Sequence, residues 1–213
     1  MTVRIALADD HQMFRQALRA MLEKVPDFEV VAEAGDGREL LRLVRTAKPD
    51  IVCMDIGMPG MNGIEATRAL MAADPKLKVI GLSAFTDQHF VMDMLSAGVA
   101  GYVTKAEAGD ELLRAIRAVQ LNRTYLCPDI AASITGALMA GAMRDSSRPR
   151  LGAREQQVLQ LIAEGHTSPE IAKKLHLAPS TVEVHRRNIM RKLDLHSVAE
   201  LTKYAIRNGL TTG

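Results

Sequence analysis

The chain has 213 residues, a formal net charge of +2 and 47% hydrophobic residues, which is enough apolar material for one large domain or two modest ones. Its two distant cysteines, Cys53 and Cys127, form neither a disulfide framework nor a zinc site. No apolar run reaches the about 18 residues that a membrane span needs, and the N-terminus lacks the apolar segment of a secretory signal, so we expect a cytoplasmic protein without membrane contact.

The charge is unevenly divided along the chain. Residues 1–125 carry 15 Lys and Arg against 17 Asp and Glu, a net charge of −2, whereas residues 126–213 carry 12 against 8, a net charge of +4. A mildly acidic front and a basic back fit a site for an ion followed by a nucleic-acid module.

Apolar runs typical of buried strands alternate with amphipathic helical patterns over the front of the chain. The expected strands are residues 3–8, 28–32, 51–54, 77–82 and 101–103, and a helix follows each of them. This alternation predicts an α/β domain with a flavodoxin-like, five-stranded parallel sheet of order 2-1-3-4-5, covered by helices on both faces. In this order, strands one and three are neighbours.

Acidic side chains stand where these two strands end. Asp9 and Asp10 follow the first strand, and Asp55 closes the third, just before a loop rich in Gly and Pro at residues 57–63. Neighbouring parallel strands end at the same edge of a sheet, where ligands of open α/β sheets bind, so the three carboxylates are expected to meet there. Alone, Asp55 would more simply cap the following loop or helix. Three crowded carboxylates instead predict a divalent cation, and an all-oxygen donor set favours Mg²⁺.

Two further polar residues, Ser83 and Lys105, end the fourth and fifth strands beside the same edge. A hydroxyl and an ammonium group are what a phosphoryl group needs opposite a metal. With a carboxylate as nucleophile, this set suits phosphoryl transfer onto Asp55. His11 follows the acidic pair without metal-ligand partners at helical spacing, so we expect it to cap or pack against the first helix.

The chain changes character after the fifth helix. Residues 130–143 are small and apolar and indicate a helix, whereas residues 144–150 are polar and rich in helix breakers, as in a linker. The pattern beyond is helical only. We therefore divide the chain into a domain at 1–121, a linker with a helix at 122–149, and a small all-α domain of four helices at 150–213.

The four-helix domain contains a helix-turn-helix pattern. Ser168, in the N-cap position, and Pro169 open its second helix, residues 178–180 turn the chain, and residues 182–193 form the third helix. Polar and basic residues gather on that third helix: His185, Arg186, Arg187, Asn188, Arg191 and Lys192. An ordinary solvated face is the simpler reading, but the second helix of such a motif is where a groove-reading helix belongs, so we expect binding to duplex DNA.

Two sets of residues carry a resemblance to a known family. In the front half they are Asp9-Asp10-His11, Asp55, Met58 to Gly63, Ser83-Ala84, Gly98 to Tyr102 and Lys105. In the back half they are Leu151, Arg154-Glu155, Val158-Leu159, Ile162 to Gly165, Glu170 to Ala172, Leu175, Ser180 to Val182, Val184-His185, Ile189 and Lys192-Leu193. Over nearly its whole length the chain resembles two-component response regulators of the NarL/FixJ type, in which a phosphoacceptor receiver domain precedes a LuxR-type helix-turn-helix.

The resemblance implies a role for each residue of the acidic site, with Asp55 as the phosphoacceptor. The implied magnesium ligands are Asp10, Asp55, the Gly57 carbonyl and, through a water molecule, Asp9. The implied partners of the phosphoryl group are Ser83 and Lys105, with Tyr102 as the aromatic residue that moves inward as Ser83 moves. The implied donor is a phosphohistidine of a sensor histidine kinase, or a small acyl phosphate.

The resemblance also implies how DNA is bound. Base edges are met by Glu183, Val184 and Arg187, and phosphates by Ser180, Thr181, His185 and Lys192. The last helix, residues 197–208, is the implied dimer face, so a homodimer meets an inverted-repeat operator. The implied function is a phosphorylation-dependent transcriptional regulator, not an enzyme, in which phosphate on Asp55 shifts dimerisation and operator binding.

Two other functions remain open at this point. A magnesium-dependent phosphatase or phosphotransferase with an aspartate nucleophile would carry a second Asp two residues further on, where this chain has Gly57. An interaction or RNA-binding output protein would need aromatic side chains for stacking on single strands, and Tyr204 is the only aromatic residue in residues 151–213. Both observations favour the DNA-binding regulator.

Overall fold

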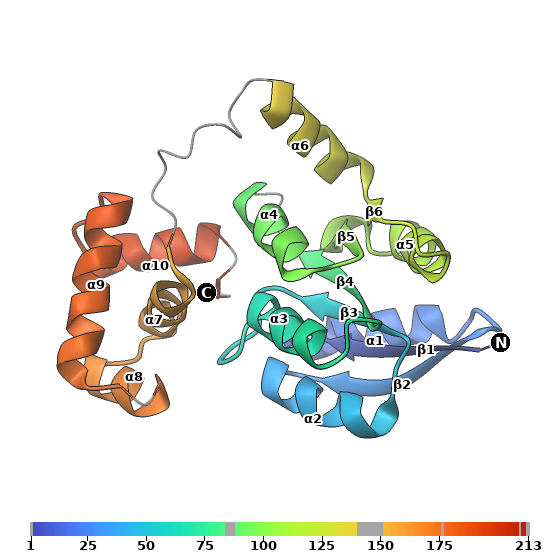
Figure 1. Ribbon diagram of the computed structural model, residues 1–213, viewed down its shortest axis with the longest axis horizontal. Helices are drawn as coiled ribbons and strands as arrows, with labels where there is room; N and C mark the ends of the chain where they lie inside the picture. Colours follow the sequence, from blue (N-terminus) through green and yellow to red (C-terminus); the bar gives the residue numbers. More distant parts are fainter. Residues whose placement is uncertain (1, 84–87, 140–150, 176, 209, 212–213) are drawn as a thin grey trace. The chain divides into compact units, whose positions relative to one another are not determined.

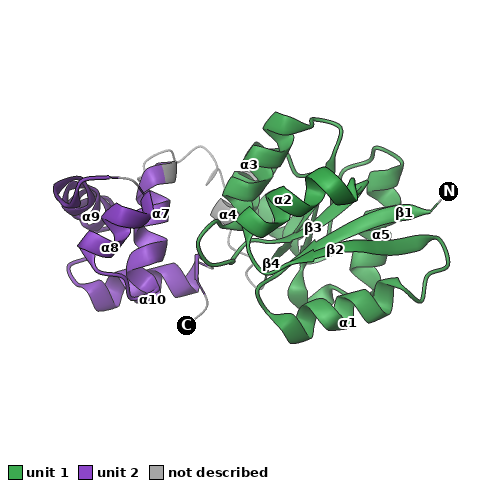
Figure 2. Cartoon of the chain, turned by 90° about the horizontal axis from the view of Figure 1, so that it is seen from below, with its two compact units in different colours: residues 1–136 green, residues 137–213 purple. Residues whose placement is uncertain are grey.

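The computed structural model describes residues 2–83, 88–139, 151–175, 177–208 and 210–211. The chain forms two compact units, residues 1–136 and 137–213, which Figure 2 shows in separate colours. The linker predicted at residues 144–150 lies outside the described residues, and the finer division of the chain into three parts stays a prediction. Within the described residues, no helix is both long and apolar enough to cross a membrane.

A parallel sheet forms the centre of the first unit. Its strands are β1 (Val3–Ala8), β2 (Phe28–Ala34), β3 (Ile51–Asp55), β4 (Lys78–Ser83), β5 (Gly101–Thr104) and β6 (Tyr125–Leu126), in the order β2-β1-β3-β4-β5-β6 (Figure 1). The predicted fold class and the order of the first five strands are confirmed, but the count of five was one strand short. The sixth has only two residues, paired with Gly101 and Tyr102 of β5, and two residues are too few to show an alternating pattern.

Helices cover both faces of this sheet. They are α1 (Gln12–Leu22), α2 (Gly37–Ala47), α3 (Gly63–Ala73), α4 (Gln88–Ala97) and α5 (Asp110–Gln120), with a 3-10 turn, η1 (Lys105–Glu107), before α5. A further helix, α6 (Pro128–Met139), follows β6 and is not part of this covering (Figure 1). On the face covered by α1 and α5, the core contains Leu18, Leu22, Ile5, Cys53, Ile80, Leu112 and Ile116. Helices α2, α3 and α4 follow one another on the opposite face. The sheet is therefore buried on both sides, and only its ends are open for polar chemistry.

The turn from β3 into α3 fixes the position of Asp55. The Asn62 side chain caps α3 by accepting a hydrogen bond from the amide of Glu65 at 2.9 Å. A Cβ atom at Gly63 would lie 2.1 Å from the carbonyl oxygen of Asp55, so only glycine permits this close approach. The amide of Gly63 donates to the carbonyl of Ile56 at 3.0 Å, which closes the loop directly behind the acidic residue.

The second unit is helical, as predicted. Its helices are α7 (Ala153–Ala163), α8 (Ser168–Leu175), α9 (Pro179–Leu193) and α10 (Val198–Arg207), and they bury Val158, Leu159, Ile171, Ala172, Val182, Ile189, Leu201 and Ala205. Ser168 is the first helical residue of α8 and not its N-cap. Thr167 precedes the helix, and the Glu170 carboxylate accepts a hydrogen bond from its amide at 2.8 Å, which gives α8 a different start from the one expected.

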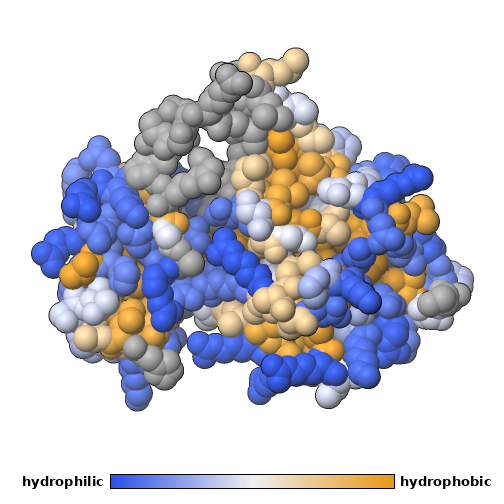
Figure 3. All heavy atoms as spheres, in the orientation of Figure 1, coloured by the Kyte–Doolittle hydropathy of each residue, from blue (hydrophilic) through white to orange (hydrophobic). Residues whose placement is uncertain are grey.

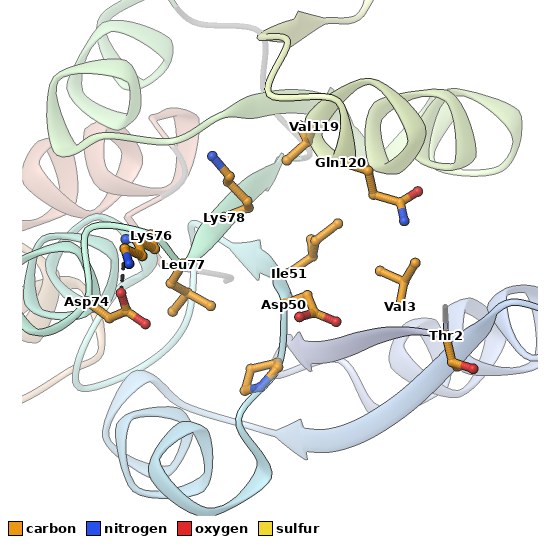
Figure 4. Close-up of a pocket in the computed structure, with 11 residues that line it drawn as sticks. Thr2, Val3, Asp50, Ile51, Asp74, Lys76, Leu77, Lys78, Val119 and Gln120 are labelled. Carbon is orange, nitrogen blue, oxygen red and sulfur yellow. Dashed lines mark hydrogen bonds between the residues drawn. The ribbon is translucent and has the colours of Figure 1, made fainter.

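A hollow of about 420 Å³ opens at the amino-terminal ends of the strands (Figure 4). Val3, Ile51 and Lys78, which begin or nearly begin β1, β3 and β4, line it together with Gln120 at the end of α5. Asp55 closes β3 at the opposite end of the sheet. The hollow is therefore separate from the acidic residues, and we assign it no part in their chemistry.

Candidate functional site

Three carboxylates and one ammonium group meet at the carboxyl ends of β1, β3 and β5. Asp9 and Asp55 are buried, with 1% and 3% of their surface exposed, and Asp10 is half-buried beside them. The Nζ atom of Lys105 lies 2.8 Å from Oδ2 of Asp9 and 2.9 Å from Oδ2 of Asp55. Ligand atoms from Asp9, Asp10, Asp55 and His11 all lie within 4.8 Å of one another. The pairing of β1 with β3 thus brings the acidic residues named from the sequence into one cluster.

The electrostatics of the cluster depend on burial. Burial raises the pKa of Asp55 to about 6. The Asp9 carboxylate adds to this increase, whereas the Lys105 ammonium opposes it. Burial alone would lower the pKa of Lys105, but the Asp55 and Asp9 carboxylates outweigh it and raise that pKa above its ordinary value. One ammonium therefore serves several crowded carboxylates, and a further cation would relieve their repulsion.

The donor set fits a hard divalent cation. The carboxylate oxygens of Asp9, Asp10 and Asp55 are the ligand type that Mg²⁺ prefers. His11 occupies the N-cap position of α1 without a side-chain cap hydrogen bond. Its Nδ1 instead lies 2.8 Å from Asp10 Oδ1 and 3.3 Å from Asp9 Oδ1. The position of His11 was expected, but the contact of its ring with the acidic cluster was not.

Three further residues were predicted for this site: Gly57, Ser83 and Tyr102. The amide of Gly57 donates to Asp55 Oδ1 at 3.2 Å. Ser83 is buried at the end of β4, where it pairs in register with Thr104, the residue before Lys105.

Tyr102 is fully buried on the face of the sheet that packs against α4. A Cβ atom at Gly81 would lie 3.3 Å from its ring and 3.0 Å from the Cε of Met94. Because side chains two residues apart on a strand share a face, Ser83 lies on the same face as Gly81 and hence on the side of the Tyr102 ring. The aromatic ring is thus in an inward position.

Two α1 residues that contact the site were missed from the sequence. The Nη1 atom of Arg15 donates to the main-chain carbonyl of Asp9. The ring of Phe14 lies with its centroid 5.1 Å from the Nζ of Lys105, a cation–π distance. Both residues are ordinary members of an amphipathic helix, and no spacing distinguishes them from residues that only support the fold.

In the second unit, α9 carries the residues named for DNA contacts. Ser180, Glu183, Val184 and Arg187 are exposed and recur at helical spacing on one face, opposite the buried Val182. Val184 is 47% exposed, which is unusual for a large apolar residue. Hydrophilic side chains cover most of this helix in the view of Figure 3. Thr181 and His185 are half-buried along the edges of the face.

Two of the named α9 residues already have partners inside the unit. The Nζ of Lys192 lies 2.6 Å from the Oε2 of the buried Glu155 on α7. The Glu183 carboxylate accepts a hydrogen bond from the hydroxyl of Ser168, which begins α8. The first contact joins α9 to α7 and the second joins the two helices of the helix-turn-helix, so both side chains also stabilise the fold.

The comparison with known families decides the assignment. Residues 5–117 match the family described as "Response regulator receiver domain", and residues 149–205 match "Bacterial regulatory proteins, luxR family". The chain is a response regulator with a LuxR-family output domain. This response regulator is 36% identical over 208 residues to "Response regulator GacA" of Pseudomonas aeruginosa, covering 98% of this chain and 97% of that protein. It is 38% identical to "Transcriptional regulatory protein LiaR" of Bacillus subtilis, covering 98% and 99%.

Solved structures agree with this assignment. RcsB from Salmonella enterica serovar Typhimurium, solved bound to promoter rprA with the phosphomimetic BeF3−, has a TM-score of 0.73 at 26% identity, covering 96% of this chain and 98% of that one. A LuxR-family response regulator from Aurantimonas sp. SI85-9A1 has a TM-score of 0.63 at 40% identity, covering 65% of this chain and 99% of that one. The resemblance to NarL/FixJ-type regulators is thereby confirmed. This response regulator is a phosphorylation-dependent transcription regulator, and its family is one of DNA-binding regulators and not of phosphatases.

Proposed function

We propose that Asp55 accepts the phosphoryl group of this response regulator from a phosphohistidine of a sensor histidine kinase. One observation carries the proposal: Asp9, Asp10, Asp55 and Lys105 converge at one end of the sheet. In the transfer, a carboxylate oxygen of Asp55 forms a bond to phosphorus while the phosphorus–nitrogen bond to the donor histidine breaks. The electron pair of the broken bond returns to the imidazole.

The residues around Asp55 divide the remaining work. Asp10, Asp55 and the Gly57 carbonyl would hold Mg²⁺, with Asp9 acting through water, and the ion would neutralise charge that develops on the phosphoryl oxygens. Lys105 keeps Asp55 available as a carboxylate against the effect of burial, and afterwards pairs with a phosphoryl oxygen. The Ser83 hydroxyl donates to another phosphoryl oxygen, and the inward ring of Tyr102 matches that arrangement.

For the output domain, α9 is the proposed recognition helix. Glu183, Val184 and Arg187 meet base edges, with Arg187 suited to guanine and the Val184 methyl groups to thymine. The phosphate contacts fall to Ser180, Thr181, His185 and Lys192, of which Lys192 would have to share its charge with Glu155. The exposed residues at the start of α9 agree with a helix that enters the major groove by its N-terminal part.

The proposed active species is a homodimer that pairs through residues 197–208, where Val198 of α10 is 41% exposed. Two recognition helices then face an inverted repeat with half-sites about 10 base pairs apart. Phosphate on Asp55 favours the dimerising state by a population shift. Because its target is bacterial chromosomal DNA, we place its action in the cytoplasm.

Mass spectrometry of the intact protein tests this function. Incubation with acetyl phosphate and Mg²⁺ should add one phosphoryl group to the wild type and none to Asp55→Asn. Asp129→Asn, at an exposed carboxylate on α6, is the control and should label normally. Labelling of Asp55→Asn at the wild-type level would refute the assignment. Selection from random duplex DNA, with and without phosphodonor, should then enrich an inverted repeat more strongly in the phosphorylated sample.

A further inference from the structure

Arg15 lies on α1, but its guanidinium group reaches back to the end of β1. Its Nη1 donates to the main-chain carbonyl of Asp9, and its Nε lies 3.2 Å from Oε2 of Glu33 on β2. The side chains of Arg15 and Glu33 are only 17% and 25% exposed. A largely dry ion pair thus ties the first helix and the second strand to one peptide group of the acidic site.

That peptide group lies where the strand ladder stops. The pairing of β1 with β2 ends at Ala8 and Ala34, and its pairing with β3 ends at Ala8 and Met54. The amide of Asp9 still donates to the carbonyl of Ala34 at 3.0 Å. Its own carbonyl lies past the ladder and takes the guanidinium of Arg15 as its donor, as a shielded main-chain acceptor requires.

The orientation of this peptide matters because it joins two acidic residues. Asp9 lies on one side of it and Asp10 on the other, and rotation of its plane would redirect both carboxylates relative to Asp55. The Oδ1 of Asp9 accepts a hydrogen bond from the amide of His11 at 2.8 Å, so the turn that follows is also held. The Arg15 contact holds the carbonyl of the Asp9–Asp10 peptide itself.

We propose that Arg15 is a positioning residue for the magnesium site, acting through the Asp9–Asp10 peptide, with Glu33 as its anchor. The inference rests on the proposed function, since it takes the acidic cluster to be the site that binds Mg²⁺. Arg15 does not itself contact the ion. It holds the ligands in the arrangement that the ion requires, as partners behind metal ligands commonly do.

Arg19, one turn further along α1, provides a matched control. Its Nη1 lies 2.5 Å from the Oε1 of Glu33 and its Nε 2.8 Å from the Oε1 of Glu23. Arg15 and Arg19 therefore share a carboxylate and a helix. The described side-chain hydrogen bonds of Arg19 go to the carboxylates of these two glutamates, whereas the Arg15 side chain also holds the Asp9 carbonyl.

Calorimetric titration of the full-length chain with Mg²⁺ tests the proposal. Arg15→Ala should weaken Mg²⁺ binding by about 10- to 100-fold, the range typical of lost partners behind metal ligands. Arg15→Lys should restore part of the affinity, and Glu33→Gln should fall between Arg15→Ala and wild type. Arg19→Ala should bind Mg²⁺ like the wild type. Circular dichroism and the thermal midpoint of each variant show whether it is folded. If Arg15→Ala does not fold, the Mg²⁺ affinity of Arg15→Lys is compared with that of the wild type and of Arg19→Ala instead.

The outcomes separate the inference from the proposed function. Wild-type Mg²⁺ affinity in folded Arg15→Ala would overturn the inference alone. An equal loss in Arg19→Ala would overturn it too, because the effect would then belong to the Glu33 ion pairs and not to the Asp9 carbonyl. Absence of Mg²⁺ binding by the wild type would instead overturn the proposed function, and the inference with it.

Discussion

At the scale of single residues, Asp55 stands in an environment that opposes its charge. Burial raises the pKa of Asp55 to about 6, Lys105 lowers it, and Asp9 raises it further. The folded state therefore holds the proton more tightly than the unfolded chain, whose Asp pKa is about 3.9. In the absence of metal, the free energy of unfolding therefore decreases as the pH rises from about 3.9 to about 6 and stays lower above that pH, because Asp55 must then ionise in the folded state. A strand end that carries such a cost is typical of a functional group.

Asp55→Asn should therefore stabilise the metal-free protein at neutral pH. The expected gain in the free energy of unfolding of the receiver unit is about 1–3 kcal/mol above pH 6, from the pKa difference between folded and unfolded states. The gain should shrink as the pH falls towards 4, because the wild-type carboxylate then protonates in the folded state. Urea unfolding at several pH values in EDTA measures it. A difference between variant and wild type that is flat from pH 4 to pH 8 would contradict this account.

Substitution of Gly63 should destabilise the receiver unit for a steric reason. Alanine there would place its Cβ 2.1 Å from the carbonyl oxygen of Asp55 and 2.9 Å from the Cα of Ile56, so main-chain atoms must move. We expect Gly63→Ala to lose about 1–3 kcal/mol of stability and most phosphorylation by acetyl phosphate. Gly109→Ala is the control, since none of the residues that the structure describes lies within 4 Å of its added Cβ. Thermal unfolding and intact-mass labelling report both effects, and normal labelling of Gly63→Ala would show that the loop can adjust.

The sequence predicts the acidic residues better than their supports. Asp9, Asp55 and Lys105 each stand at or just after a strand end, and parallel strands bring such residues to one edge. Arg15 acts on a main-chain carbonyl, and a contact with the backbone leaves no pattern in residue types. The spacing of Lys192 places it on the basic face of a helix. Its ion pair with Glu155 could not be predicted from the sequence, because it depends on how α7 packs against α9.

At the scale of elements, long periodic segments were predictable and short ones were not. The strands and helices of the receiver unit, from β1 to α5, follow clear apolar patterns, and α2, α3 and α4 end just before Pro or Gly. The two-residue β6 has no period of its own and exists because the chain after α5 runs beside β5. The start of α8 moved by one residue because the Thr167 amide finds the Glu170 carboxylate.

The contact between α7 and α9 gives a prediction at this scale. Burial alone would raise the pKa of Glu155, but Lys192 and the amide of Gly152 outweigh it and hold that pKa below its ordinary value. Glu155→Gln should destabilise the second unit by about 1–3 kcal/mol at pH 7. The loss should diminish as the pH falls below the ordinary Glu pKa of about 4.3 and vanish once the pH passes the lowered pKa of folded Glu155, where the wild-type carboxylate also protonates. Thermal melts across pH measure this.

A double-mutant cycle checks the cause of that effect. Lys192→Gln alone leaves the buried carboxylate without its cation, whereas the double variant Glu155→Gln/Lys192→Gln removes both charges. The double variant should therefore be more stable than the sum of the two single losses predicts. Strict additivity would mean that the two side chains do not interact energetically, whatever their separation.

At the scale of the whole molecule, the receiver part of the chain is mildly acidic and the DNA-binding part is basic. Residues 1–125 have a net charge of −2 and residues 126–213 a net charge of +4. This division suits a chain whose front takes up a cation and a phosphoryl group and whose back binds DNA phosphates. A regulator of this kind is described by the coupling free energy between its two sites, and binding at each site must influence the other equally.

This reciprocity yields a prediction for the full chain. If beryllofluoride, bound with Mg²⁺ as a phosphoryl mimic, tightens operator binding by some factor, then operator DNA must tighten beryllofluoride binding by the same factor, which we expect to be about 5- to 150-fold. Fluorescence anisotropy with labelled operator gives the first factor, and calorimetry with and without saturating operator gives the second. Asp55→Asn should reduce both factors to one, whereas Arg187→Ala should weaken operator binding yet leave beryllofluoride affinity without DNA unchanged. A factor of one in both directions for the wild type would show that phosphorylation does not control the DNA-binding unit through this equilibrium.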